Sequence, residues 1–175
     1  MKKTLALILI FMLGVSILAG CNGGGGSSRS SGPERLDAGD ISVEVPSGWK
    51  GYLISESMTP DDTDYRTNQI EVYKGADSFW DIYIKPGLRI VYYGAGREMD
   101  NPDYFFSDPE TLPAMELGGR TWNGYKGFWL DEERALLWTE DGVHQIRIEV
   151  VLESDGKISL SDADVRAIIA SIELS

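Results

Sequence analysis

The sequence predicts a single α+β domain, in which a mostly antiparallel β-sheet carries a C-terminal helix packed on one face. Apolar and polar side chains alternate over residues 144–153, which is typical of a strand with one buried face. Over residues 165–172 the apolar side chains instead recur at the spacing of an amphipathic helix. Several shorter alternating runs, separated by Gly and Pro turn signals, favour antiparallel pairing for the rest of the sheet.

The first strands are predicted near the start of this domain. Residues 41–45 alternate, and the Pro-Ser-Gly turn signal that follows ends the strand. Residues 49–54 form a predicted second strand and residues 69–73 a third, with a polar loop over residues 56–68 between them.

A hairpin is predicted next. Residues 79–84 and 88–93 are rich in aromatic and β-branched side chains, and Lys-Pro-Gly at 85–87 supplies a turn. Residues 94–116 are predicted to be a structured loop, because their three prolines discourage a long regular element.

The final strands are predicted over residues 121–130, 134–139 and 144–153, with a turn at Glu-Asp-Gly before the last. The last run is the clearest, because its apolar and polar side chains separate onto two faces: Ile146, Ile148, Val150 and Leu152 against Gln145, Arg147, Glu149 and Glu153.

The chain ends in a predicted helix. Its apolar stripe consists of Val165, Ile168, Ile169 and Ile172. Ser161 is a suitable N-cap, and Asp162 and Asp164 would lie in the first turn, where the helix dipole favours carboxylates.

Residues 1–20 have the organisation of a secretory signal peptide, with two lysines, then an uncharged apolar run and small residues at the end. The run is shorter than the roughly 20 residues of a membrane span. Leu-Ala-Gly-Cys, ending at Cys21, resembles the lipobox of bacterial lipoproteins. In that family the thiol receives a diacylglycerol, and cleavage makes the cysteine the new N-terminus. The resemblance implies lipidation of Cys21; a retained membrane helix and an ordinary signal peptide are the alternatives.

Residues 21–39 form a predicted tether, rich in Gly and Ser, between this anchor and a domain over residues 40–175. A flexible tether of this length has an end-to-end distance of roughly 25 Å. Two acyl chains hold a protein stably on a bilayer, whereas one does so only marginally. We therefore expect a lipid-anchored protein on the extracytoplasmic side of a cell membrane or outer membrane.

The charge of the chain limits its partners. The net charge is −12, and loss of residues 1–20 would take away two lysines and no acid, giving −14. Such a chain is a poor ligand for nucleic acid, whose phosphates attract Lys and Arg. Cys21 is the single cysteine, so the domain has no cysteine for a thiol nucleophile, a disulfide or a zinc site.

Two segments resemble the opening and closing signatures of PsbP-like domains: Ile-Ser-Val-Glu-Val-Pro-Ser-Gly-Trp at 41–49 and Asp-Val-Arg-Ala-Ile-Ile-Ala-Ser-Ile-Glu-Leu at 164–174. The resemblance implies an α/β/α sandwich and an accessory or binding role without catalysis. It transfers no functional residues. The family usually has a helix between its early strands, and no convincing one is found here.

Few residues suggest chemistry. His144, the single histidine, leads a predicted strand in phase with the inward side chains, which favours a position at the rim of the sheet over a catalytic role. The acidic loops at 61–64 and 100–103 offer oxygen ligands that Ca²⁺ accepts, although the EF-hand spacing is absent. Trp80 is out of phase with Tyr83, so an aromatic surface for sugars or peptides is possible unless a helix or loop covers it.

The sequence therefore predicts a lipid-anchored extracytoplasmic binding or accessory domain that is not an enzyme. It assigns no catalytic residue, no metal ligand and no cofactor. The expected partners are the membrane, through Cys21, and an envelope protein or small ligand. The alternatives are a cell-envelope hydrolase that uses paired carboxylates and a Ca²⁺-responsive module.

Overall fold

The computed structural model describes residues 33–54, 68–94 and 105–175. The predicted signal peptide, Cys21 and both acidic loops, at 61–64 and 100–103, lie outside the described residues.

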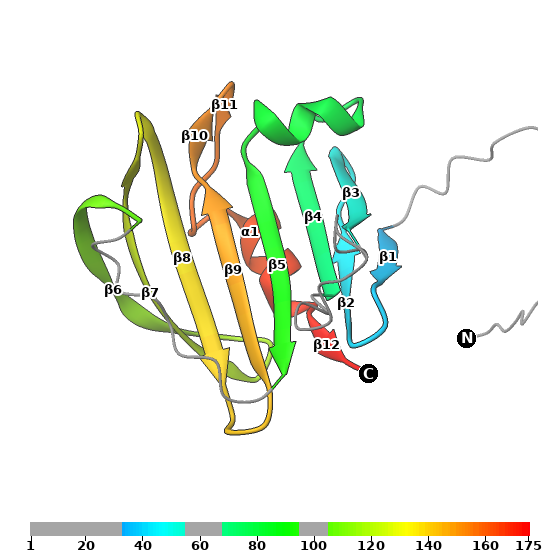
Figure 1. The fold of residues 1–175 in the computed structure, drawn as a ribbon. Coiled ribbons are helices and arrows are strands. Elements are labelled where there is room, and N and C mark those ends of the chain that lie inside the picture. The colour runs from blue at the N-terminus through cyan, green and yellow to red at the C-terminus, as the bar shows by residue number, and fades with distance from the viewer. Residues whose placement is uncertain (1–32, 55–67, 95–104) are drawn as a thin grey trace, which may run out of the picture.

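A seven-stranded antiparallel sheet forms the body of the domain (Figure 1). Its strands, in spatial order, are β3 (Trp49–Ile54), β4 (Asn68–Lys74), β5 (Gly87–Gly94), β9 (Gln145–Val151), β8 (Glu132–Glu140), β7 (Arg120–Trp129) and β6 (Ser107–Leu117). The predicted strands at 49–54, 69–73, 88–93, 121–130, 134–139 and 144–153 are confirmed, with small shifts at their ends.

Two smaller sheets accompany it. One has the order β1 (Glu34–Asp37), β2 (Ile41–Val45), β12 (Glu173–Leu174), and the other pairs β10 (Glu153–Ser154) with β11 (Gly156–Lys157). The strand at 41–45 is confirmed. β1, which lies within the predicted tether over residues 21–39, pairs with β2 along its whole length.

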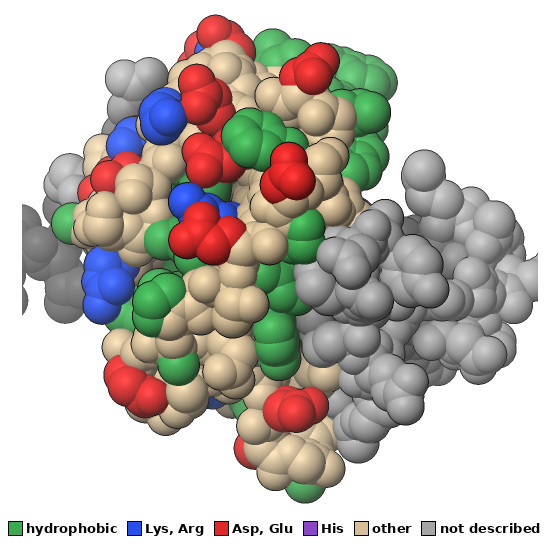
Figure 2. Space-filling model, turned by 90° about the vertical axis from the view of Figure 1, so that its left-hand side faces the viewer, with side chains coloured by type: hydrophobic (Ala, Val, Ile, Leu, Met, Phe, Trp, Pro, Cys, Tyr) green, Lys and Arg blue, Asp and Glu red, His purple; other side chains and the backbone are tan. Residues whose placement is uncertain are grey.

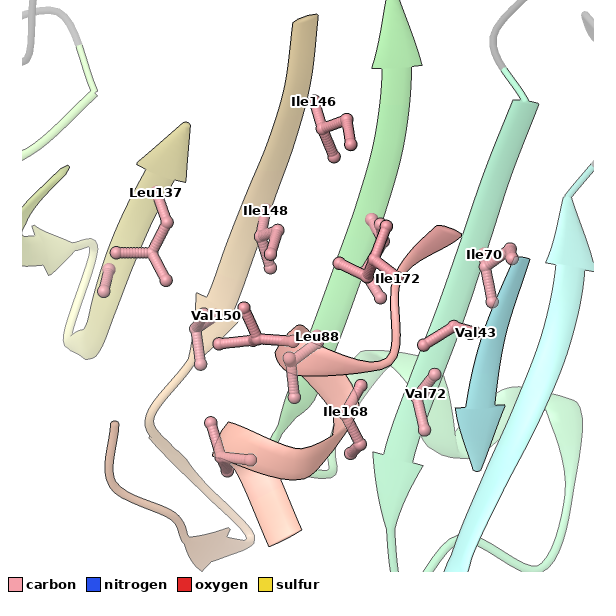
Figure 3. Close-up of a cluster of buried hydrophobic side chains, with 14 of the residues drawn as sticks. Val43, Ile70, Val72, Leu88, Leu137, Ile146, Ile148, Val150, Ile168 and Ile172 are labelled. Carbon is pink, nitrogen blue, oxygen red and sulfur yellow. The ribbon is translucent and has the colours of Figure 1, made fainter. Parts of the chain in front are cut away.

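The main cluster of buried apolar side chains includes residues of the large sheet, of β2 and of the helix α1 (Ala163–Ala170), which stands behind β5 and β9 in Figure 1. Figure 3 shows inward side chains of the strands, such as Leu88 and Ile148, meeting Ile168 of the helix and Ile172 just after it. These four side chains are at most 1% exposed. Full burial of one such side chain stabilises the fold by about 1.5–3 kcal/mol, which explains why the alternating and helical patterns predict the fold well.

The predicted hairpin at 79–84 and 88–93 is half wrong, because its first arm is the 3₁₀ helix η1 (Phe79–Tyr83). The reason lies in the cap. The Asp81 carboxylate accepts hydrogen bonds from the backbone N–H groups of Asp77 and Ser78, each 2.7 Å long. Such local bonds satisfy the free N–H groups at a helix start and outweigh the β-rich composition of the segment.

The predicted loop over 94–116 is also partly wrong, because its second half is strand β6. β6 is an edge strand of the sheet, so backbone N–H groups on its outer side have no partner strand. A proline, which lacks this N–H, is therefore tolerated there. Its register with β7 shifts twice, between Ser107 and Glu110 and between Leu112 and Met115, which is where Pro109 and Pro113 lie. Prolines and bulges on an edge strand also discourage pairing with other chains.

The start of the C-terminal helix differs by one residue from the prediction. Asp162, and not Ser161, occupies the N-cap position. The Ser161 hydroxyl lies 2.9 Å from that of Ser159, and the Asp162 carboxylate accepts the Ser159 N–H at 3.0 Å. Asp164 lies in the first turn, as expected.

Candidate functional site

The face of the large sheet opposite α1, here called the outer face, carries charged side chains. Neighbouring strands place Glu71, Arg89 and Glu149 directly opposite one another in register. Inward positions on the same strands are apolar, because successive residues of a strand point to opposite faces. Within the described ranges, α1 is the single α-helix, and it lies behind the sheet in Figure 1, away from this face.

The first part of the outer face is a buried cluster around Glu71, which is 4% exposed. Its carboxylate accepts hydrogen bonds from the Tyr73 hydroxyl at 2.8 Å and the Gln69 amide at 2.5 Å. Arg89 donates through Nε to the Tyr73 oxygen at 3.2 Å and approaches Glu149 at 3.5 Å. Burial, reinforced by Glu71, raises the pKa of Tyr73 well above its ordinary value, so the hydroxyl stays a donor.

The second part centres on Arg134, which is 7% exposed. Its guanidinium pairs with both Glu132 and Glu149, and it lies 4.2 Å from the centre of the Trp129 ring. The Ser154 hydroxyl donates to Glu132 at 3.2 Å. A continuous polar network therefore runs from β4 across β5, β9 and β8 to β10, and it makes this face a rigid floor.

A cleft of about 530 Å³ opens over this floor, between η1 and the turn from β7 to β8. We call it the η1 cleft. Apolar walls come from both sides, and charged groups line the base; the lining residues are Ile82, Tyr83, Lys85, Arg89, Trp129, Leu130, Asp131, Glu132, Arg134, Val151 and Ser154.

The cleft is bordered by large apolar side chains that reach into solvent. Leu130 is 77% exposed and Trp80 is 73% exposed, and Phe79, Tyr83 and Ile84 are exposed by about half or more. Trp80 stacks on Tyr83 with ring centres 6.4 Å apart. Figure 2 shows hydrophobic side chains gathered at the upper end of the molecule, which is the end that carries η1 in Figure 1.

η1 is held in place on this end by several bonds. The two backbone bonds to Asp81 lower the pKa of that carboxyl group. The Asp155 N–H donates to the Ile84 carbonyl at 2.9 Å, and Lys85 pairs with Asp155 at 2.5 Å. Beneath η1, the Tyr52 hydroxyl is buried and has no hydrogen-bond partner among the described residues, although its ring meets that of Phe79 edge to face. The apolar side chains are therefore displayed by a fixed element.

His144 lies at the opposite end of the sheet, in the turn between β8 and β9. Its Nδ1 is 2.7 Å from the Tyr92 hydroxyl, and the ring is half-buried at the edge of a mostly polar cavity of about 470 Å³. The Asp141 carboxylate accepts the backbone N–H groups of His144 and Val143, which lowers its pKa and shapes the turn. The structure therefore places His144 at the rim of the sheet, far from the η1 cleft.

The structure does not test the Ca²⁺ hypothesis, which stays a prediction. Within residues 33–54, 68–94 and 105–175, no group of three or more His, Cys, Asp or Glu is arranged to hold a metal ion. The two acidic loops on which the hypothesis rests are not among these residues. None of the helices in the described part of the chain has the length and apolarity to cross a membrane.

Sequence reasoning found part of this site. The phase of Trp80 against Tyr83 suggested an exposed aromatic surface, and Trp80 is indeed highly exposed. The Arg134 and Glu71 clusters were missed, because a cross-strand pair depends on the register between strands far apart in the chain. The polar side chains that share one face of β9 were the sequence signal for a charged outer face.

Comparison with known proteins gives this chain a structural neighbour. No family model matches it, and neither does any curated protein. Among solved structures, the solution structure of cyanobacterial PsbP (CyanoP) from Synechocystis sp. PCC 6803 is similar, with a TM-score of 0.45 and 10% sequence identity. The similar region covers 87% of this chain and 98% of that one. The described part of the chain is mostly antiparallel sheet with one α-helix near the C-terminus, and CyanoP is a structural neighbour at low sequence identity.

Proposed function

We propose that this protein is a lipid-anchored extracytoplasmic binding or accessory module without catalytic activity, and that it binds its partner at the η1 cleft. The proposal treats the domain as a PsbP-like sandwich with α1 packed on one face of the large sheet. The observation that carries it is the exposed apolar surface around η1, which stands on a rigid, internally paired floor.

The size of that surface supports binding. Phe79, Trp80, Tyr83, Ile84, Trp129 and Leu130 are 44–77% exposed and together present on the order of 700 Å² to solvent. The largest apolar patch on an ordinary monomer is about 300–600 Å², and larger patches mark interaction sites. One partner of a standard interface buries about 800 Å². The surface is therefore large enough to form most of one binding face.

Its composition also supports binding. Trp, Tyr, Phe and Arg are enriched where proteins meet, and the side chains that dominate affinity are often Trp and Tyr. Trp80 and Tyr83 are fixed by a short capped element, so little conformational entropy is lost when a partner covers them.

The arrangement of carboxylates argues against the hydrolase alternative on this face. Glu71, Glu132 and Glu149 are each engaged by Arg89 or Arg134. Guanidinium groups occupy these carboxylates, so their oxygens are not free to hold the attacking water or the leaving group of a hydrolysis.

The proposed localisation of the protein depends on lipidation of Cys21. A thiol carrying two acyl chains would hold the domain near a membrane, and the tether would leave the η1 end free to turn. A Cys21→Ser protein should lose both membrane fractionation and labelling by radioactive palmitate. Retention of the variant on membranes would contradict the anchor.

Site-specific photo-crosslinking in cells tests the binding face. A photoreactive residue replaces Trp80 in the full-length protein, and the matched control carries it at Val143, which is 59% exposed in the turn at the other end of the sheet. We expect a discrete crosslinked product from position 80 and none of the same mass from position 143. Equal products at both positions, or none at either, would contradict the proposal.

A further inference from the structure

We propose that the occupant of the η1 cleft is a polypeptide segment of a partner protein that presents an apolar side chain flanked by Lys or Arg. This inference rests on the proposed function and specifies the chemistry of the partner. Two features carry it: the apolar walls of the cleft and the acidic side chains that surround them.

The walls fit a bulky apolar side chain. Tyr83 and Ile82 on η1 face Trp129 and Leu130 across about 530 Å³. Leu130 adopts a left-handed backbone conformation with φ of 57°, which an L-residue enters only at a cost. Burial of an aromatic or aliphatic anchor there would remove apolar surface from water on both sides of the contact.

The rim is acidic. Asp131 lines the cleft on the side of the β7–β8 turn. On the η1 side, Asp155 bonds to Lys85, and Asp81 and Asp77 lie near enough to raise the pKa of that lysine further. Asp77, Asp131 and Asp155 are all exposed. A ligand that reaches the apolar walls must pass close to these carboxylates.

The cations of the cleft are already paired within the domain. Lys85 pairs with Asp155, Arg134 pairs with Glu132 and Glu149, and Arg89 approaches Glu71 and Glu149. The acidic rim of the cleft therefore attracts positively charged ligands, and the net charge of −12 on the chain favours the same ligands.

The same charges argue against other occupants. An anionic lipid surface would bring negative headgroups against Asp77, Asp131 and Asp155, within a Debye length of about 8 Å. A second copy of this chain would bring an identical acidic rim. A basic peptide segment meets neither objection.

Labelled peptides test the inference on the full chain in detergent micelles. Each peptide holds a central tryptophan in a Gly-Ser frame, flanked by two lysines, two serines or two glutamates on each side. We expect the lysine peptide to bind most tightly and the glutamate peptide not to bind, with the difference shrinking as salt is raised. Trp80→Ala should weaken binding of the lysine peptide by about tenfold or more.

Charge variants separate a local from a global effect. The triple variant Asp77→Asn, Asp131→Asn and Asp155→Asn should weaken the lysine peptide about five- to tenfold, from three exposed pairs. The control triple variant has Glu116→Gln, Glu140→Gln and Glu173→Gln. It changes net charge equally at the other end of the sheet and should have little effect.

Several results would overturn the inference: no binding of the lysine peptide, equal binding of the lysine and glutamate peptides, or equal losses in the two triple variants. Binding to phosphatidylglycerol vesicles that depends on Trp80 would point to a membrane occupant and overturn it too. The crosslinking experiment at position 80 is independent of these results. A discrete crosslink there would support the proposed function even if this inference failed, so the two failures are distinguishable.

Discussion

Replacement of Arg134 by alanine is expected to lower the free energy of unfolding by about 3 kcal/mol. Arg134 is 7% exposed, and its guanidinium pairs with Glu132 and Glu149 and lies against Trp129. Loss of one partner of a buried pair typically costs about 3–5 kcal/mol, and a cation–π contact adds about 1 kcal/mol. We take the lower end, because the side chains of Glu132 and Glu149 keep 31% and 25% exposure and can be rehydrated.

The assay is urea unfolding at pH 7, followed by tryptophan fluorescence. With a slope of about 2 kcal/mol per molar urea, the midpoint should fall by roughly 1.5 M. Arg134→Lys should lose only about 1–2 kcal/mol, because it keeps the charge but not the forked pairing. The control Lys50→Ala, an exposed cation on β3, should change stability by less than about 0.5 kcal/mol.

A loss below about 1 kcal/mol for Arg134→Ala would refute the reasoning, because the network would then contribute little to the floor of the cleft. A double-mutant cycle with Glu149→Gln gives a second check. It should show a coupling of about 1 kcal/mol or more, and strict additivity of the two losses would contradict a direct pair.

Three further changes are expected to have defined outcomes. Tyr52→Phe should leave stability unchanged or raise it by up to about 1 kcal/mol in urea unfolding, because it removes a buried hydroxyl that has no partner in the described part of the chain; a large loss would contradict this. Gly118→Ala should lower the thermal midpoint, because Gly118 has φ of 60° and an added Cβ would lie 2.5 Å from the Ala170 carbonyl oxygen; an unchanged midpoint would contradict this close approach. Backbone bonds lower the pKa of Asp81, and the Trp49 indole N–H, followed by Lys74, lowers that of Asp164. Both carboxyl groups thus stabilise the fold above their unfolded pKa of about 4, and this contribution is lost as pH falls through the lower folded values. Melts from pH 7 to 3 should show the loss, and a midpoint that rises toward pH 3 would exclude it.

The sequence predicted the elements that bury a regular apolar pattern. Ile146, Ile148 and Val150 alternate into the core, and Val165 and Ile168 keep the helical period, because burial of each side chain fixes which face points inward. These patterns also predicted the class of the fold.

The predictions failed where local bonds or position in the sheet outweighed composition. η1 has the composition of a strand, but the Asp81 cap makes it helical. β6 has prolines that discourage a strand, but its edge position tolerates them. The η1 cleft is formed by η1, the β7–β8 turn and a cross-strand network, so its position could not be derived from any single segment.

Amide hydrogen exchange of the full chain in micelles, with and without the lysine-flanked tryptophan peptide, tests the central claim most directly. We predict slower exchange in residues 79–85 and 129–132 when the peptide is bound, and unchanged exchange in the β8–β9 turn at 141–144. Protection at that turn, or no protection around η1 at a saturating peptide concentration, would contradict a binding face at the η1 cleft.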